Sequence, residues 1–187
     1  MALTTLDPKT ALIVVDLQKG IVTYPVVHSI EQVIDRSRAL IEAFRARGLP
    51  VVLVNVTGGA PGRTERPQRD MSALPADFAD LVPELGLQPS DILVTKQSWG
   101  AFAGTDLDQR LKALGVTQVV ICGIATATGV EATARQAYEN GFNVTLAIDA
   151  MSDTRPEAHD YSIRNVFPRL GETGCTDDIL SHLERCS

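Results

Sequence analysis

Three polar features of the sequence have residue types suited to chemistry on a small molecule. Asp16 ends one apolar run, Lys96 ends another, and a third apolar run leads into the turn Gly123–Gly129. If these runs are parallel strands of an open α/β sheet, all three features lie at its carboxyl edge, where such sheets bind ligands. A carboxylate, an ammonium group and an amide-rich turn at a helix start can bind and polarise a polar substrate. Each feature alone has a commoner structural explanation, so it is their coincidence that indicates a site.

The elements that must position these residues alternate along the chain. Short apolar, β-branched runs are typical of strands buried on both faces of a parallel sheet, and amphipathic stretches with helical spacing separate them. The expected strands are Thr10–Asp16, Pro50–Val56, Ile92–Lys96, Gln118–Cys122 and Asn143–Asp149. This alternation predicts a doubly wound α/β fold with right-handed crossovers.

Helices are expected between these strands, and their ends carry recognisable signals. Ser29 and Gln32 form a capping-box pattern before a helix that Gly48 closes. The other expected helices begin at Thr105, Gly129, Pro156 and Thr176, and the first two of these end near Gly115 and Gly141. Residues 57–89 are rich in glycine and proline, which predicts a long functional loop with one short helix. Without a linker or an internal repeat, residues 1–187 are expected to form a single domain.

Composition argues against several classes of partner. The net charge is −6 and no basic run is long enough to follow a phosphate backbone, which argues against nucleic acid and anionic membranes. No stretch reaches the roughly 18 apolar residues of a membrane span, and the first residues lack the order of a signal peptide. Three cysteines, an odd number, fit a reducing compartment, so we expect a cytoplasmic protein. His28, His159 and His182 are scattered without metal-ligand spacing, so we expect neither a metal nor another cofactor.

The residues around the three features resemble the motifs of isochorismatase-like cysteine hydrolases, which include nicotinamidases and carbamoyl-amide hydrolases. Asp16-Leu17-Gln18 resembles their Asp-x-Gln, and Lys96 with residues 99–107 (WGAFAGTDL) resembles their lysine and S-A-F-x-G-T-x-L block. Residues 123–135 (GIATATGVEATAR) resemble the nucleophile motif G-V-x-T-x-x-C-V-x-x-T-A-R. The resemblance implies a three-layer α/β/α sandwich over a six-stranded parallel sheet, ordered 3-2-1-4-5-6. It also implies a cis peptide bond between Ile124 and Ala125.

The sequence departs from this pattern at the nucleophile. In the cysteine members, the aspartate takes the thiol proton, the lysine supports the ionised pair, and the thiolate attacks an amide carbonyl. Gly129 stands where that cysteine is expected, which closes the acyl-enzyme route through this position. The resemblance still assigns oxyanion-binding backbone N–H groups to Ala125 and Gly129. Gly100 replaces a serine of the family block, and Cys122 is expected in the core rather than as a substitute nucleophile.

Three functions remain open for such a site. True isochorismatases can also carry glycine here, and their vinyl-ether substrate needs an acid that protonates carbon; Asp16 would be that acid and Lys96 would orient it or bind a substrate carboxylate. Alternatively, the chain is a catalytically silent ligand-binding homologue, or an amidase that uses water activated by Asp16. Because a neighbouring ammonium lowers a carboxyl pKa, the first function requires burial to outweigh Lys96.

Candidates for substrate binding are fewer and less specific. Arg63 on the long loop, with Arg66 and Arg69 nearby, would suit an anionic substrate. Trp99 and Phe102 would line an apolar wall or belong to the core, and Gln18 and Ala125 follow from the motifs. The resemblance also implies a small-molecule substrate and a homo-oligomer, a dimer or larger.

Overall fold

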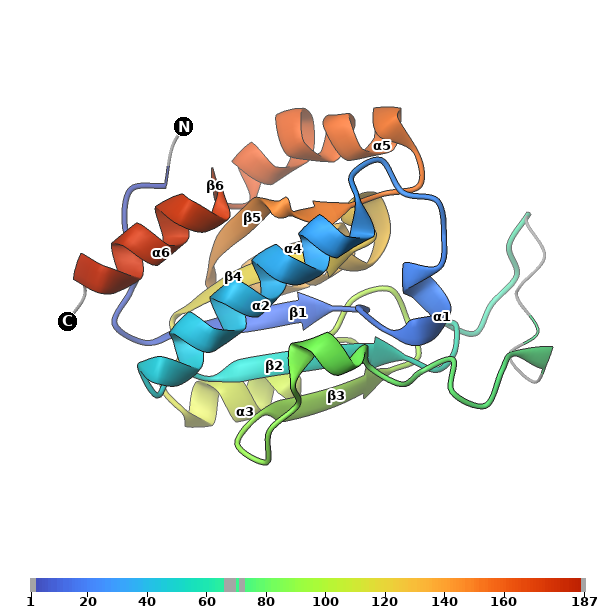
Figure 1. The fold of residues 1–187 in the computed structure, drawn as a ribbon, viewed down its shortest axis with the longest axis horizontal. Coiled ribbons are helices and arrows are strands. Elements are labelled where there is room, and N and C mark those ends of the chain that lie inside the picture. Colours follow the sequence, from blue (N-terminus) through green and yellow to red (C-terminus); the bar gives the residue numbers. More distant parts are fainter. Residues whose placement is uncertain (1–2, 66–69, 71–72, 186–187) are drawn as a thin grey trace.

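The computed structural model describes residues 3–65, 70 and 73–185, and its centre is a six-stranded parallel sheet (Figure 1). The strands are β1 (Thr10–Val15), β2 (Val51–Val56), β3 (Ile92–Lys96), β4 (Gln118–Ile124), β5 (Asn143–Ser152) and β6 (Glu172–Gly174). They are ordered β3-β2-β1-β4-β5-β6, and every neighbouring pair is parallel. The predicted fold class and strand order are therefore confirmed.

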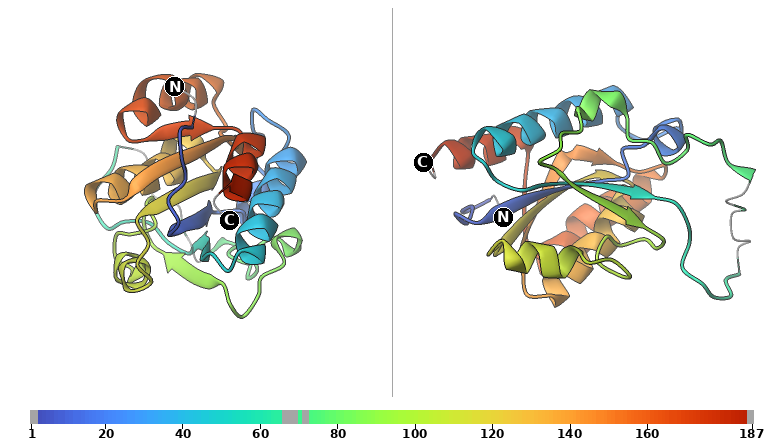
Figure 2. Two further views of the ribbon diagram at one scale, coloured as in Figure 1. Left: turned by 90° about the vertical axis from the view of Figure 1, so that its left-hand side faces the viewer. Right: turned by 90° about the horizontal axis from the view of Figure 1, so that it is seen from below.

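Helices cover both faces of the sheet and make three layers, as the side and lower views show (Figure 2). One face carries α2 (Ile30–Ala46) and α6 (Thr176–Arg185). The other carries α3 (Leu107–Ala113), α4 (Glu131–Glu139) and the segment that follows α5 (Pro156–Tyr161). The expected cap at Ser29 is present, because its side chain accepts a hydrogen bond from the Gln32 backbone N–H.

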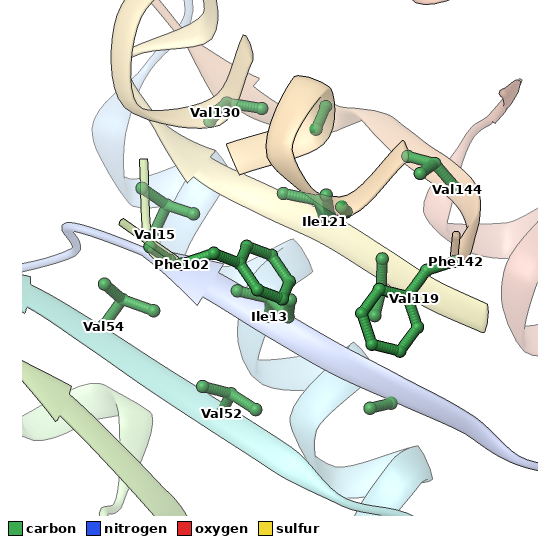
Figure 3. Packing of buried hydrophobic residues seen from close by; sticks show 14 of the residues in the cluster. Ile13, Val15, Val52, Val54, Phe102, Val119, Ile121, Val130, Phe142 and Val144 are labelled. Atoms are coloured by element: carbon green, nitrogen blue, oxygen red, sulfur yellow. The ribbon is translucent and has the colours of Figure 1, made fainter. Parts of the chain in front are cut away.

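The sheet is buried on both sides because its strands are apolar at consecutive positions. Ile13 and Val15 of β1 point into the core under α3 and α4, whereas Leu12 and Val14 point into the core under α2 and α6. Figure 3 shows the first of these two cores, built from alternate residues of β1, β2 and β4. Successive residues of a run such as ALIVV therefore face two different cores in turn, which explains why every position in the run is apolar.

Some boundaries differ from the prediction, for local reasons. β4 continues to Ile124 and β5 to Ser152, because pairing between them resumes beyond a register irregularity after Ile121. The predicted helix from Gly129 instead begins with a π-helical turn, Thr126–Val130, that leads into α4. The short helix α1 (Lys19–Val22) was not expected, since four residues are too few to show helical periodicity.

The long segment after β2 leaves the sheet and returns to it near Phe78. Its first part, residues 57–65, extends away from the body of the molecule in Figures 1 and 2, and a 3-10 turn, Pro83–Leu85, lies in the region where a short helix was expected. Its return is fixed by backbone bonds from Lys19 N to Asp80 O at 2.8 Å and from Gly20 N to Phe78 O at 3.0 Å. No helix in the described residues has the length and apolar character needed to cross a membrane.

Candidate active site

The structure brings Asp16 and Lys96 together, although they come from strands that are not neighbours. Asp16 directly follows β1, Lys96 ends β3, and β2 lies between them. The long lysine side chain crosses that gap, and its Nζ lies 2.8 Å from Asp16 Oδ2. The same ammonium also donates to the backbone oxygen of Ser98 at 3.1 Å, which fixes its direction.

Burial controls the charge state of this pair. Only 6% of the Asp16 side chain and 1% of the Lys96 side chain is exposed to solvent. Loss of solvation raises the pKa of Asp16 from 3.8 to about 6, against the smaller opposing effects of the Lys96 charge and hydrogen bond. Within the described part of the chain, Asp16 Oδ1 has no hydrogen-bond partner. Near neutral pH this carboxyl can therefore either give or take a proton.

Gly129 faces the same carboxylate from the turn after β4. A β-carbon built on Gly129 would lie 3.1 Å from Asp16 Oδ2 and 3.2 Å from the backbone oxygen of Ile124. A side chain at this position would thus begin beside Asp16, as the position of a nucleophile requires. Because residue 129 is glycine, Asp16 and Lys96 face backbone atoms at this position and no thiol group.

The turn itself is held by its own hydrogen bonds. The peptide bond between Ile124 and Ala125 is cis, as the resemblance implied. The Ala125 oxygen accepts from the N–H groups of Thr128 and Val130, both at 3.1 Å, and Ala127 donates to Asp153 Oδ2 at 2.8 Å. None of these bonds uses the N–H groups of Ala125 and Gly129, the two predicted oxyanion donors.

Glycine at position 123 is required by the approach of β4 to β1. Its φ is +113°, and a β-carbon there would lie 2.1 Å from the Val15 oxygen. No side chain fits at that distance, so the backbone of the turn can approach Asp16 only with glycine at 123.

The other predicted binding residues lie in different surroundings. Gln18 is buried, and its amide donates to the backbone oxygens of Val56 and Phe78 and accepts from the Val56 N–H at 2.8 Å. It therefore fastens the long segment to the end of β2, which favours a structural role.

Phe102 also belongs to the hydrophobic core and not to an exposed apolar wall of a pocket. It is buried in the core under α3 and α4, where Figure 3 shows it over Ile13, and its ring lies 5.8 Å from that of Phe142. Trp99 by contrast is 67% exposed. Arg63 is exposed on the segment that extends from the body, while Arg66, Arg69 and Cys186 lie outside the described residues.

Sequence reasoning missed the side chains that connect the parts of the site. Thr133 on α4 donates to the Gly129 oxygen at 2.7 Å and accepts from the Ala101 N–H at 3.1 Å. Gln136 Oε1 accepts from the N–H groups of Phe102 and Ala103. Thr133 lies in the motif of residues 123–135, so the sequence did carry a signal for it. Gln136 lies about one helical turn after Thr133 on α4. Together they join the turn to the loop that follows Lys96.

The comparisons with known proteins agree with this geometry. The sequence profile described as "Isochorismatase domain" matches residues 10–178. This chain belongs to the isochorismatase family. It is accordingly an isochorismatase-like hydrolase, and the family resemblance of its motifs is confirmed.

Relatives of this family member come from several bacteria. It is 42% identical to the isochorismatase family protein YwoC of Bacillus subtilis, over 94% of this chain and 95% of that protein. A solved structure of an isochorismatase family protein from Burkholderia thailandensis has a TM-score of 0.92 and 41% identity, over 96% of this chain and 98% of that one. It is also 32% identical to the ureidoacrylate amidohydrolase RutB of Stutzerimonas stutzeri, over 90% of this chain and 80% of that protein.

Proposed function

We propose that this isochorismatase-family hydrolase acts on a small carboxylated or ether-containing metabolite by acid–base chemistry of Asp16, without a cysteine nucleophile. The observation that carries the proposal is the buried Asp16–Lys96 pair opposite Gly129, with the pKa of Asp16 raised to about 6. A carboxyl group with this pKa is protonated in a useful fraction of molecules at neutral pH, so it can serve as an acid. The burial of Asp16 raises its pKa more than the Lys96 charge lowers it, as an acid at this position requires.

For a vinyl ether the steps follow from these groups. Lys96 holds Oδ2, so the proton of the neutral carboxyl is on Oδ1, and Asp16 transfers it to the enol carbon. Water then adds to the neighbouring carbon of the resulting cation and returns a proton to Asp16. In the hemiketal so formed, the hydroxyl proton is transferred to the ether oxygen as the carbon–oxygen bond breaks, which releases an alcohol and a ketone; for isochorismate the ketone is pyruvate. The ammonium of Lys96 keeps the carboxylate in place between these transfers.

A second candidate, an amidase, is supported by the likeness to the amidohydrolase and by the Asp16 oxygen that has no described partner. In this case the ionised Asp16 removes a proton from water, which attacks the amide carbonyl. The two functions predict opposite pH dependences. With Asp16 as the acid, kcat/KM falls as pH rises through about 6, whereas with Asp16 as the base it rises over the same range.

The test is pyruvate release from isochorismate beside ammonia release from a panel of small amides, each from pH 5 to pH 8. The acid assignment predicts pyruvate formation that is lost in Asp16→Asn and kept in Asp160→Asn, an exposed aspartate on α5. Pyruvate formation that survives Asp16→Asn overturns it. Ammonia release that requires Asp16 selects the amidase. No turnover on either panel, with tight binding of a small acid, selects a silent ligand-binding homologue.

We also propose that the chain assembles into a homo-oligomer, a dimer or larger. The exposed ring of Trp99, the exposed Leu93 of the edge strand β3 and the segment that extends from the body support this. Size-exclusion chromatography with light scattering tests it, and a monomeric mass at micromolar concentration contradicts it.

A further inference from the structure

Two histidines that are 131 residues apart in sequence meet outside the Asp16 site. His28 precedes α2 and His159 lies on α5, and their Nε2 atoms are 3.2 Å apart. The ring planes make an angle of 74°, with centroids 4.9 Å apart. His159 is buried and His28 is exposed, so the pair joins the interior to the surface. Beside it lies a cavity of about 550 Å³ that Asp35, Arg36 and Asp149 also line.

Both histidines are held in place by bonds to the sheet and to the turn after β4. The His28 N–H donates to Ser152 Oγ at 2.9 Å, and the preceding N–H, of Val27, donates to the Asp153 oxygen at 2.9 Å. The Nδ1 of His159 lies 2.8 Å from Thr126 Oγ1. A histidine that binds a metal through one ring nitrogen usually has its other nitrogen held in this way, which fixes the ring and its tautomer.

We propose that the Nε2 atoms of His28 and His159 form a binding site for a divalent transition-metal ion such as Zn²⁺, Ni²⁺ or Cu²⁺. With metal–nitrogen bonds of about 2.0 to 2.1 Å, two nitrogens lie about 3.4 Å apart on a tetrahedral centre and about 2.9 Å apart at right angles. The observed 3.2 Å lies between these values. An ion can therefore replace the hydrogen bond between the rings with little change in the separation of the two nitrogens, once the rings turn their lone pairs toward it.

The chemistry of the pair allows this exchange. In the neutral pair with His159 protonated on Nδ1, Thr126 Oγ1 accepts a hydrogen bond from that N–H, and His28 donates to His159 through its Nε2–H. When an ion binds, the His28 proton moves to Nδ1 and both Nε2 lone pairs become ligands. The two carboxylates that line the cavity are each paired with an arginine, Asp149 with Arg36 and Asp35 with Arg38, so the two imidazole nitrogens provide the ligands.

The site is open rather than a closed structural cage. No group of three or more metal-ligating side chains occurs among the residues described, so water fills the remaining positions. A bound ion would join the segment before α2 to α5, and α5 through Thr126 to the turn that carries Gly129. Because the ion binds the folded chain at a geometry the unfolded chain lacks, it should raise the unfolding temperature.

The test is titration of the untagged full chain with Zn²⁺, Ni²⁺ and Cu²⁺ by calorimetry and thermal unfolding. We expect one ion per chain, a higher unfolding temperature with the ion, and two nitrogen ligands in the paramagnetic resonance spectrum of the Cu²⁺ complex. His28→Gln, at an exposed position, should abolish all three effects. His182→Gln and Cys175→Ser should keep them, because neither side chain lies in the pair.

The proposal fails if none of the three ions shows saturable binding to the wild-type chain. It also fails if His28→Gln binds as tightly as wild type, or if the Cu²⁺ spectrum shows fewer than two nitrogen ligands. The resonance measurement uses the wild-type chain, so it decides the question even if the variant folds poorly. None of these outcomes depends on the reaction proposed for Asp16.

Discussion

Replacing Asp16 with asparagine should change how the stability of the protein depends on pH. The pKa of this carboxyl is raised from 3.8 to about 6, chiefly by burial. Since one pKa unit corresponds to about 1.4 kcal/mol, ionised Asp16 costs the folded state about 3 kcal/mol relative to its protonated form. Asparagine has nearly the same shape as the protonated acid and cannot ionise, so the variant escapes this cost.

The direction of the effect follows from which state binds the proton more tightly. The folded-state pKa is raised, so the contribution of the Asp16 proton is fully present below about pH 3.8 and is lost as pH rises through about 6. The free energy of unfolding of the variant minus that of wild type should therefore rise by about 2 to 3 kcal/mol between pH 4 and pH 7.

Urea unfolding at pH 4, 5, 6 and 7 and constant ionic strength measures this difference, provided that the denaturant dependence is the same in both proteins. Asp160→Asn, in which an exposed carboxylate is removed, is the matched control and should give a nearly flat difference. A flat or falling difference for Asp16→Asn would mean that Lys96 outweighs burial. Asp16 would then be ionised at all working pH values, and its role as an acid would be refuted.

Three further substitutions test other parts of the site. Gly129→Cys places a thiol beside Asp16, so it should react with iodoacetamide faster than Cys122, whose burial raises its pKa to about 12. Gly123→Ala forces a methyl group against a backbone oxygen of β1 at a positive φ, and should lower the free energy of unfolding by about 3 kcal/mol or more in urea unfolding. Gln18→Leu leaves buried backbone groups without partners, which should cost about 1 to 3 kcal/mol and speed proteolysis of the segment after β2.

Each of these has a control and a contradicting result. Equal labelling of the new thiol and Cys122 would mean that position 129 does not face Asp16. Gly59→Ala, where a β-carbon meets no atom within 4 Å, should change stability little; an equal loss at both glycines would contradict the packing argument. Gln109→Leu, on the exposed side of α3, should leave proteolysis unchanged. If Gln18→Leu also left the rate of proteolysis unchanged, this result would contradict the structural role of Gln18 and favour a role in substrate binding.

Much of the fold could be predicted because its signals are local. Runs of β-branched residues marked five of the six strands, and Ser29, Gly48 and Gly115 marked helix ends. The sixth strand, Glu172–Gly174, was expected only through the family, because three residues with mixed polarity carry no pattern of their own. The π-helical turn before α4 was not predicted, since its position depends on how the turn packs against β1.

The site was predicted in part, and the limits have physical causes. Asp16 and Lys96 could be placed at one sheet edge because each ends a predicted parallel strand, but their 2.8 Å contact and the raised pKa depend on burial by distant segments. Gln18 and Phe102 are motif residues, but the Gln18 side chain binds the backbone of the long segment at Phe78 and the Phe102 side chain packs in the core. The pairing of His28 with His159 joins elements far apart in the chain, so no sequence spacing could indicate it.

The place of Gln136 bears on how such a protein can change over evolutionary time. A β-carbon at position 100 would lie 2.3 Å from Gln136 Oε1, so the glutamine occupies the volume that a serine at that position would need. A single mutation to serine would displace the amide and leave the N–H groups of Phe102 and Ala103 without their acceptor. The two positions should therefore be inherited as a pair. A lineage that acquired a cysteine at 129 and the family serine at 100 would have to move or exchange Gln136 as well.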